Sequence, residues 1–256
     1  EDPVMPLRAI TFDIWETIFV DGSDESKRAA QGMRSKSNER RHLIWSALND
    51  QAPLDKGLSD AAFDVQEAAF RKAWHSMCVT WEVADRIDIL LDGLNRDLPR
   101  DVRDDLIAKL EDMEICVPPD LVDGASDAIA DLASRYDLCI ISDTIYTPGR
   151  GLRELLMHHG VGQYFSGFVF SDQIGRSKPH SDCFSSAANQ LGVDFPEMLH
   201  IGDRDAKDVV GAQAMGMKAI LFTAARDEGS SATTRANAIV GVYADLVSVI
   251  DDIASQ

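Results

Sequence analysis

The apolar run Ala9–Phe12, closed by Asp13, constrains the fold of this chain more than any other feature. The run is short and contains β-branched residues, a composition typical of a buried strand. Open α/β folds bind their ligands at the carboxyl edge of the sheet, and a carboxylate that follows a strand lies at that edge. A single Asp at a strand end can equally cap a turn, so its interpretation depends on the rest of the chain.

Three later segments also carry polar side chains at or soon after an apolar run. They are Leu138–Asp143, which ends in Ser142 and Asp143, the loop Arg176–Pro179 with Lys178, and Leu199–Asp203 followed by Asp208. Together with Asp13, these segments supply a carboxylate, a hydroxyl, an ammonium group and an acidic pair. In this order they resemble the four motifs of the haloacid dehalogenase (HAD) superfamily, and the resemblance spans almost the whole chain.

The order of expected elements favours an α/β fold with an insertion. About Ser23 to Val117 is nearly all helical in its periodicity and has no strand signal. Helices and strands alternate after it, which is typical of a parallel sheet with right-handed crossovers. The resemblance implies a Rossmann-like HAD core, residues 5–22 and 118–256, with strand order 5-4-1-2-3 and a helical (C1-type) cap at 23–117. We expect a last edge strand at Ala238–Val240.

Within the helical region, local signals predict where helices begin and which side chains are buried. Asn38 is the expected cap of one helix and Ser59 of the next. Aromatic and apolar residues at helical spacing indicate a bundle core. They are Phe63, Phe70, Trp74, Met77 and Trp81.

Composition limits the possible partners and location. The net charge of -18 argues against a nucleic-acid or anionic-membrane partner. A small anionic substrate stays possible, because a local cluster or a metal can reverse the field in a cleft. The four cysteines form no CxxC pair and are interpreted as reduced thiols. No apolar run is long enough to span a bilayer. We expect a cytoplasmic monomer or homodimer, and we interpret the four residues before Met5 as a remnant.

Asp13 is the predicted nucleophile. A carboxylate can attack phosphorus or carbon and thereby split one difficult displacement into two easier steps. Lys178 would supply the positive charge that an anionic substrate needs, by bridging Asp13 and the transferred group. The run Gly175–Pro179 matches the third motif of the family. By the second motif, the hydroxyl of Ser142 and the backbone amide of Asp143 would hold phosphoryl oxygens.

Asp203 and Asp208 indicate a metal site. Carboxylates close to Asp13 would repel one another and raise their pKa values unless a cation offsets the charge. Mg²⁺ prefers carboxylate, carbonyl and water oxygens. The resemblance implies Asp13, the backbone carbonyl of Trp15 and Asp203 as ligands, and it implies that Asp208 orients Lys178 or a bound water.

Trp15 stands where phosphatases of the family carry a second Asp. That Asp protonates the leaving oxygen and later activates water, and an indole can do neither, although Trp15 can still contact the substrate. Glu16 is adjacent, but in an extended chain it would point to the opposite side. Three functions stay open. They are a Mg²⁺-dependent phosphatase that forms an aspartyl-phosphate from a small phosphate ester or anhydride, a carbon–halogen hydrolase of the haloacid dehalogenase type, and a phosphate-binding module with little turnover.

Asp203 favours the phosphatase, because the dehalogenases work without a metal and their fourth motif lacks this acid. Phosphonoacetaldehyde hydrolase also lacks the second Asp but uses a cap lysine as a Schiff base. Lys56 is the nearest candidate for that role, and a solvated loop lysine explains it equally well. The densest basic group of the chain includes Arg40 and Arg41. These two are candidate contacts for an anionic substrate group, and a solvated connector is the alternative.

Overall fold

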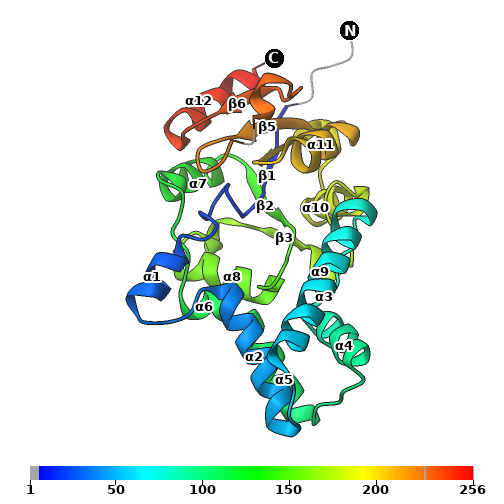
Figure 1. Cartoon of the computed structure of the whole chain (residues 1–256). Coiled ribbons are helices and arrows are strands. Elements are labelled where there is room, and N and C mark those ends of the chain that lie inside the picture. The colour runs from blue at the N-terminus through cyan, green and yellow to red at the C-terminus, as the bar shows by residue number, and fades with distance from the viewer. Residues whose placement is uncertain (1–5, 228, 256) are drawn as a thin grey trace.

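The computed structural model describes residues 6–227 and 229–255. The expected core start at Met5 and the four residues before it lie outside the described part. A parallel sheet forms one end of the molecule and a group of helices forms the other (Figure 1). The strands are β1 (Ala9–Phe12), β2 (Asp137–Ser142), β3 (Gly167–Phe170), β4 (Met198–Gly202), β5 (Lys218–Phe222) and β6 (Ala238–Val240).

The sheet has the order β3-β2-β1-β4-β5-β6, and every pair in it is parallel. The predicted order 5-4-1-2-3 is therefore confirmed, and β6 is the added edge strand. Ile10 of β1 lies opposite Leu138 on one side and Leu199 on the other. The residue after β1, Asp13, consequently lies at the carboxyl edge in the interior of the sheet.

Helices cover both faces of the sheet, which explains why the strands are apolar throughout. Ile10 and Phe12 belong to a core cluster with residues of α7 and α12, whereas Ala9 belongs to a second cluster with residues of α10. After the helical region predicted at 23–117, the chain forms the helices α7 (Ala125–Ala133), α8 (Gly149–His158), α9 (Ser171–Ile174), α10 (Ser181–Leu191), α11 (Val210–Ala214) and α12 (Tyr243–Ala254). Helix α11 is preceded directly by a π-helix, η3 (Asp205–Val209).

Six helices lie between β1 and α7, all within the described residues, and we call this group the helical insertion. They are α1 (Asp24–Ala30), α2 (Lys36–Gln51), α3 (Lys56–Met77), α4 (Val83–Leu94), α5 (Arg100–Glu111) and α6 (Met113–Cys116). The insertion has its own hydrophobic cluster, which includes Ile44, Phe63 and Leu106. Figure 1 shows α2, α4 and α5 at the end of the molecule opposite α12, and α3 runs from that end toward the sheet.

Two predicted helix caps are wrong by three or four residues. Helix α2 begins at Lys36, and the hydroxyl of Ser35 accepts the backbone N–H of Asn38 at 3.4 Å. Helix α3 begins at Lys56, and Asp55, not Ser59, accepts the backbone N–H of Leu58 at 2.9 Å. Ser, Asp and Asn have similar preferences for the cap position, so the local sequence could not rank them.

The basic group begins within residues 20–37, and the structure does not support the alternative of a solvated connector there. This segment contains helix α1, and Arg28 in it is 1% exposed and donates from Nε to the carbonyl of Arg34 at 3.1 Å. Lys36 is buried between two carboxylates. In the predicted aromatic stripe, Met77 is 63% exposed and Trp81 lies beyond the end of α3, so these two do not belong to it.

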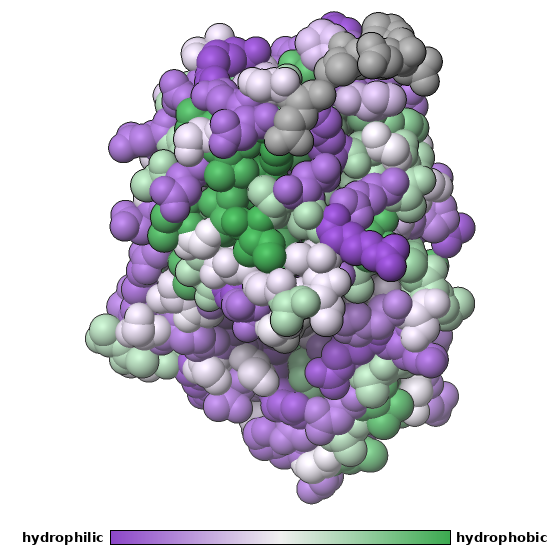
Figure 2. Space-filling view, turned by 90° about the horizontal axis from the view of Figure 1, so that it is seen from above, coloured by the Kyte–Doolittle hydropathy of each residue, from purple (hydrophilic) through white to green (hydrophobic). Residues whose placement is uncertain are grey.

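Figure 2 shows the sheet end of the molecule, seen from the side opposite the insertion. Hydrophilic side chains cover most of this face around one hydrophobic area. Within the described residues, none of the helices combines the length and the apolar character needed to cross a bilayer.

Candidate active site

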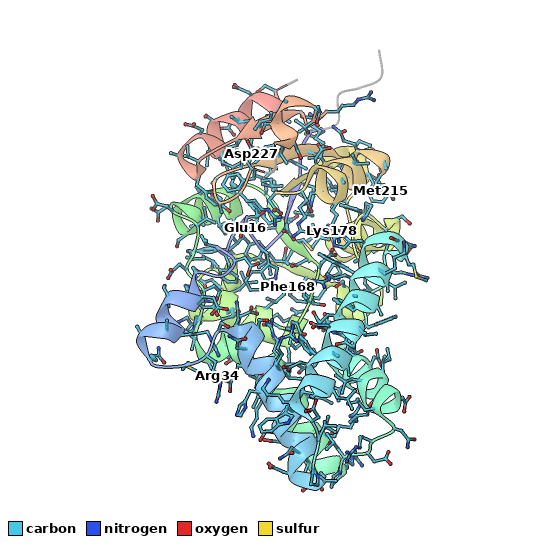
Figure 3. All side chains as sticks on the ribbon, viewed as in Figure 1. Glu16, Arg34, Phe168, Lys178, Met215 and Asp227 are labelled. Carbon is cyan, nitrogen blue, oxygen red and sulfur yellow. The ribbon has the colours of Figure 1, made fainter. Side chains whose placement is uncertain are left out.

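A cavity of about 340 Å³ lies between the carboxyl edge of the sheet and the helical insertion. This volume is at the small end of the range for small-molecule sites. The segments that follow the strands at this edge contribute Asp13, Asp143, Lys178, Asp203 and Asp208, and the insertion contributes Arg40, Phe70, Arg71 and Trp74. In Figure 3 the labels of Glu16 and Lys178 mark the region between the two parts.

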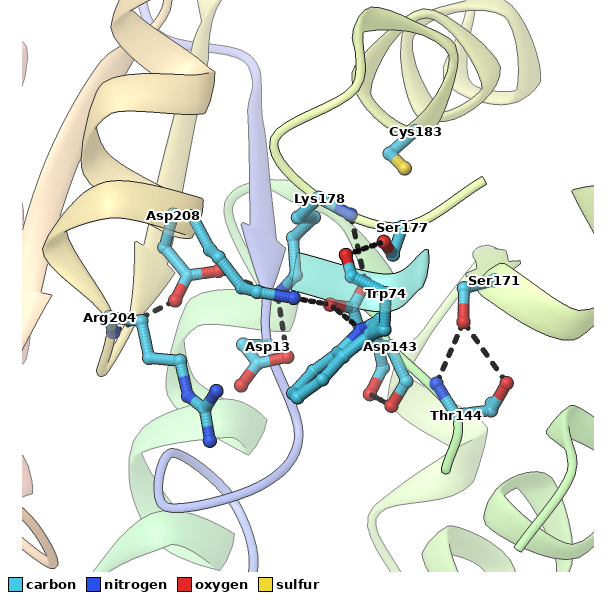
Figure 4. A network of polar contacts seen from close by, with 12 residues as sticks. Asp13, Trp74, Asp143, Thr144, Ser171, Ser177, Lys178, Cys183, Arg204 and Asp208 are labelled. Carbon is cyan, nitrogen blue, oxygen red and sulfur yellow. Dashed lines mark hydrogen bonds and ion pairs between the residues drawn. The ribbon is translucent and has the colours of Figure 1, made fainter. Parts of the chain in front are cut away.

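Lys178 joins two of the predicted catalytic carboxylates. Its ammonium group donates to Asp13 Oδ1 and to Asp208 Oδ1, each at 2.6 Å (Figure 4). Burial by itself would lower the pKa of Lys178, but the attraction of Asp13 and Asp208 outweighs it and holds this pKa above its ordinary value. Lys178 is therefore a fixed positive charge beside Asp13.

Asp208 is held by donors on both carboxylate oxygens. Its Oδ1 also lies 3.1 Å from Nε2 of His200, and its Oδ2 accepts the backbone N–H of Arg204 at 2.9 Å. Although burial opposes it, the charge of Lys178 and the His200 contact lower the pKa of Asp208. A β-carbon on Gly202 would lie 2.3 Å from Cγ of Asp208, so glycine is required for this close approach. These contacts fit a carboxylate that orients Lys178.

Asp203 completes an acidic group that a divalent cation would fit. Ligand oxygens of Asp13, Asp203 and Asp208 lie within 4.8 Å of one another. Asp203 Oδ2 is buried and accepts no hydrogen bond from any described residue, and Arg204 Nε lies 3.9 Å away. Burial and the charges of Asp13 and Asp208 raise the pKa of Asp203 to about 8.

The carboxyl group of Asp13 also has a raised pKa. Burial, which is the largest effect, and the nearby Asp208 raise its pKa to about 6 even though Lys178 lowers it. The raised pKa values of Asp13 and Asp203 mean that Lys178 compensates only part of the negative charge of the carboxylate group. A hard cation with oxygen ligands would offset it, so the residues present fit Mg²⁺.

The side chains of Ser142 and Asp143 form contacts within the protein, whereas the sequence predicted that the Ser142 hydroxyl and the Asp143 amide hold phosphoryl oxygens. Ser142 is buried at the end of β2, donates to the carbonyl of Asp143 at 3.3 Å, and is not among the residues that line the cavity. The Asp143 carboxylate accepts the backbone N–H of Lys178 at 2.9 Å, the indole N–H of Trp74 at 3.0 Å and the ammonium group of Lys207 at 2.6 Å. Asp143 therefore joins the sheet, the Lys178 loop and helix α3.

Sequence reasoning missed Lys207 and His200. The Lys207 ammonium lies 3.5 Å from the centre of the Trp74 ring, and burial lowers its pKa. His200 is fully buried in β4, where Nδ1 lies 2.8 Å from the Thr11 hydroxyl. A basic residue directly before Asp208 and a histidine within an apolar strand were the available signals.

Trp15 and Glu16 both line the cavity, contrary to the extended geometry assumed from the sequence. The chain turns after Ile14, and Glu16 has a φ of 58° in the left-handed region. Its backbone N–H donates to the carbonyl of Phe19 at 2.7 Å. Burial and the charge of Asp21 raise the pKa of the Glu16 carboxyl.

Of the two candidate arginines, the structure brings only Arg40 to the cavity. Arg41 points elsewhere and donates to Asp64 at 2.5 Å and to the carbonyl of Asp60 at 3.3 Å. Lys56 does not line the cavity either, and it forms an ion pair with Asp60 at 2.8 Å. The structure therefore gives no support to Lys56 as a Schiff-base lysine.

A model of the haloacid dehalogenase-like hydrolases matches residues 7–216, and the chain belongs to this family. One similar protein is the 5-amino-6-(5-phospho-D-ribitylamino)uracil phosphatase YigB of Escherichia coli, 39% identical over 93 residues, which are 36% of each chain. A glyceraldehyde 3-phosphate phosphatase of Methanothermobacter thermautotrophicus is 29% identical over 130 residues, 50% of this chain and 54% of that one. The matches thus cover about a third to a half of these relatives.

The fold is similar to that of a solved HAD phosphatase from Thermococcus onnurineus. The TM-score is 0.61 at 19% sequence identity, over 95% of this chain and 98% of the other. At this identity the similarity concerns the fold.

Proposed function

We propose that this protein is a Mg²⁺-dependent phosphatase that hydrolyses a small phosphate ester or anhydride through an aspartyl-phosphate on Asp13. The observation that carries the proposal is the buried group of Asp13, Asp203 and Asp208 around Lys178, at the carboxyl edge of the sheet. The phosphatase names of the similar proteins support the same activity.

In this mechanism Asp13 attacks the phosphorus atom, the bond from phosphorus to the leaving oxygen breaks, and the leaving group departs as its oxyanion. Lys178 binds the phosphoryl oxygens and holds Asp13, and Asp208 orients Lys178. Asp13, Asp203 and the backbone carbonyl of Trp15 would hold Mg²⁺, which supplies charge neutralisation for the transferred group. We expect the backbone amides after β2 to bind phosphoryl oxygens, since the Ser142 hydroxyl is turned to the Asp143 carbonyl. Water then releases the phosphate from Asp13.

We further propose that residues 23–117 act as a helical, C1-type cap over a core of residues 5–22 and 118–256. The support is the cavity between the two parts, with Arg40, Phe70 and Trp74 on the insertion side. Trp15 would contact the substrate beside Asp13. A cytoplasmic location, a monomeric or homodimeric state and the absence of a nucleic-acid partner stay predictions from the composition.

A panel assay tests the proposed reaction. We expect Mg²⁺-dependent phosphate release from at least one small phosphate ester or anhydride, and no halide release from haloacids. Halide release without added metal would contradict the proposal and favour the dehalogenase. Phosphate binding without turnover on the whole panel would favour the binding module.

Mg²⁺ is expected to raise the melting temperature, because a ligand that binds only the folded state stabilises it by mass action. Asp203, with a pKa of about 8, carries a proton below that pH, and Mg²⁺ must displace it. The increase should therefore grow as the pH rises from about 6 to about 8. Thermal melts with and without Mg²⁺ at several pH values measure it.

Asp203→Ala should remove most of this increase. Asp205→Ala is the matched control, since Asp205 belongs to the same loop but accepts a hydrogen bond from Thr234. If millimolar Mg²⁺ leaves the melting temperature of the wild type unchanged, the metal site is wrong and the dehalogenase interpretation regains support.

A further inference from the structure

The insertion end of the cavity carries three cationic side chains, and two of them, Arg40 and Arg71, form no ion pair among the described residues. Lys36 and Arg40 lie one turn apart on α2, and both line the cavity. Lys36 donates to Asp24 and Glu114, each at 2.8 Å, so its charge is already paired. Among the described residues, Arg40 and Arg71 have neither a hydrogen bond nor an ion pair to any carboxylate.

Two carboxylates that line the cavity together with Arg40 have other partners. Glu67 accepts from Arg86 and, at 2.6 Å, from the hydroxyl of Tyr146. Glu114 is held by Lys36 and by the Thr147 hydroxyl. Neither acid is left to compensate Arg40.

The guanidinium group of Arg40 is held in place by stacking on the ring of Tyr146. Its guanidinium carbon lies 3.6 Å from the centre of the Tyr146 ring, a stacking contact that leaves the N–H groups in the guanidinium plane. Its Nε is buried and has no hydrogen-bond partner within the described residues. A buried N–H without an acceptor is costly unless a ligand supplies one. A carboxylate or phosphate matches the in-plane donors of a guanidinium.

We propose that the substrate carries a second oxyanion on its leaving group, and that Arg40 binds this group while the phosphoryl group lies at Asp13. Arg71, at the exposed rim of the same cavity, adds to the attraction. This inference rests on the proposed phosphatase function. The cavity of about 340 Å³ restricts such a substrate to a small molecule.

Titration calorimetry with Mg²⁺ and three phosphonates tests the inference. Propylphosphonate has a terminal methyl group, which phosphonopropionate replaces by a carboxylate and ethylenebisphosphonate by a second phosphonate. We expect the wild type to bind one of the two probes that carry a second acidic group about 10-fold or more tightly than propylphosphonate, the scale of one charge-assisted hydrogen bond. The tighter of the two identifies the second group as a carboxylate or a phosphate.

Arg40→Met should abolish this preference, and Arg41→Met should keep it, because Arg41 lies on the same helix but outside the cavity. Arg40→Lys retains the charge without the planar donors and should keep only part of the preference, which provides a second variant if Arg40→Met melts abnormally. Equal wild-type affinity for all three probes would overturn the second oxyanion and leave the phosphatase proposal intact. If no probe binds, the phosphate site itself is wrong, and both proposals fail.

Discussion

Asp13→Asn is expected to reduce hydrolysis by on the order of 10,000-fold or more, the scale for the loss of a covalent nucleophile. The amide keeps the shape of the carboxylate but cannot attack phosphorus. The fold should persist, because Lys178 retains its ion pair with Asp208 at 2.6 Å. Steady-state kinetics on the best phosphate and a thermal melt measure the two effects.

Asp21→Asn is the matched control for this variant, since Asp21 lines the same cavity and has no role in the proposed reaction. It should stay within a few-fold of the wild-type rate. A folded Asp13→Asn variant that hydrolyses any substrate at the wild-type rate would show that Asp13 is not the nucleophile.

Aryl or acyl phosphates are expected to react about 100- to 10,000-fold faster than alkyl phosphates, the usual contribution of general acid catalysis. Trp15 cannot donate a proton to the leaving oxygen, and an alkyl alkoxide needs one in the transition state, whereas an aryl oxide does not. Rates over a series of leaving groups of increasing pKa measure this dependence.

Trp15→Asp should then accelerate alkyl esters selectively. Trp15 packs against Phe19, with ring centres 6.1 Å apart, so the stability of the variant must be measured as well. Loss of a fully buried Trp costs about 3–5 kcal/mol, and Trp15 is only partly buried. Equal wild-type rates on aryl and alkyl phosphates would mean that another group donates the proton. Glu16, which lines the same cavity, would be the first residue to test.

The sheet and its functional edge could be predicted because both follow from local pattern. Each strand is an apolar run, and a side chain that follows a strand of a parallel sheet lies at the carboxyl edge. This rule places Asp13 and Asp203, which directly follow β1 and β4, and the resemblance to the HAD motifs adds Lys178 and Asp208. The structure brings the four side chains together.

The remaining features depend on contacts between distant segments, and the sequence does not encode them locally. Arg40 and Arg41 are adjacent and chemically identical, and only the packing of α2 decides that one lines the cavity and the other pairs with Asp64. The left-handed turn at Glu16 and the contact between Lys207 and Asp143, across 64 positions, likewise arise from tertiary structure.

The same limitation applies to buried charge. The sequence around Lys36 is polar and gives no sign of burial, but Glu114, at the other end of the insertion, accepts the ammonium group of Lys36 at 2.8 Å. Burial of a lysine requires such a partner. No pattern near residue 36 reveals a carboxylate 78 positions away.

Trapping of the covalent intermediate tests the central proposal most directly. The protein is mixed with an aryl phosphate and Mg²⁺, quenched in acid during turnover, digested and analysed by mass spectrometry. We expect one added phosphoryl group on the peptide that contains Asp13, and none in the Asp13→Asn variant or without Mg²⁺. Turnover with an unmodified Asp13 peptide, or with the phosphoryl group on another residue, would contradict the proposed mechanism.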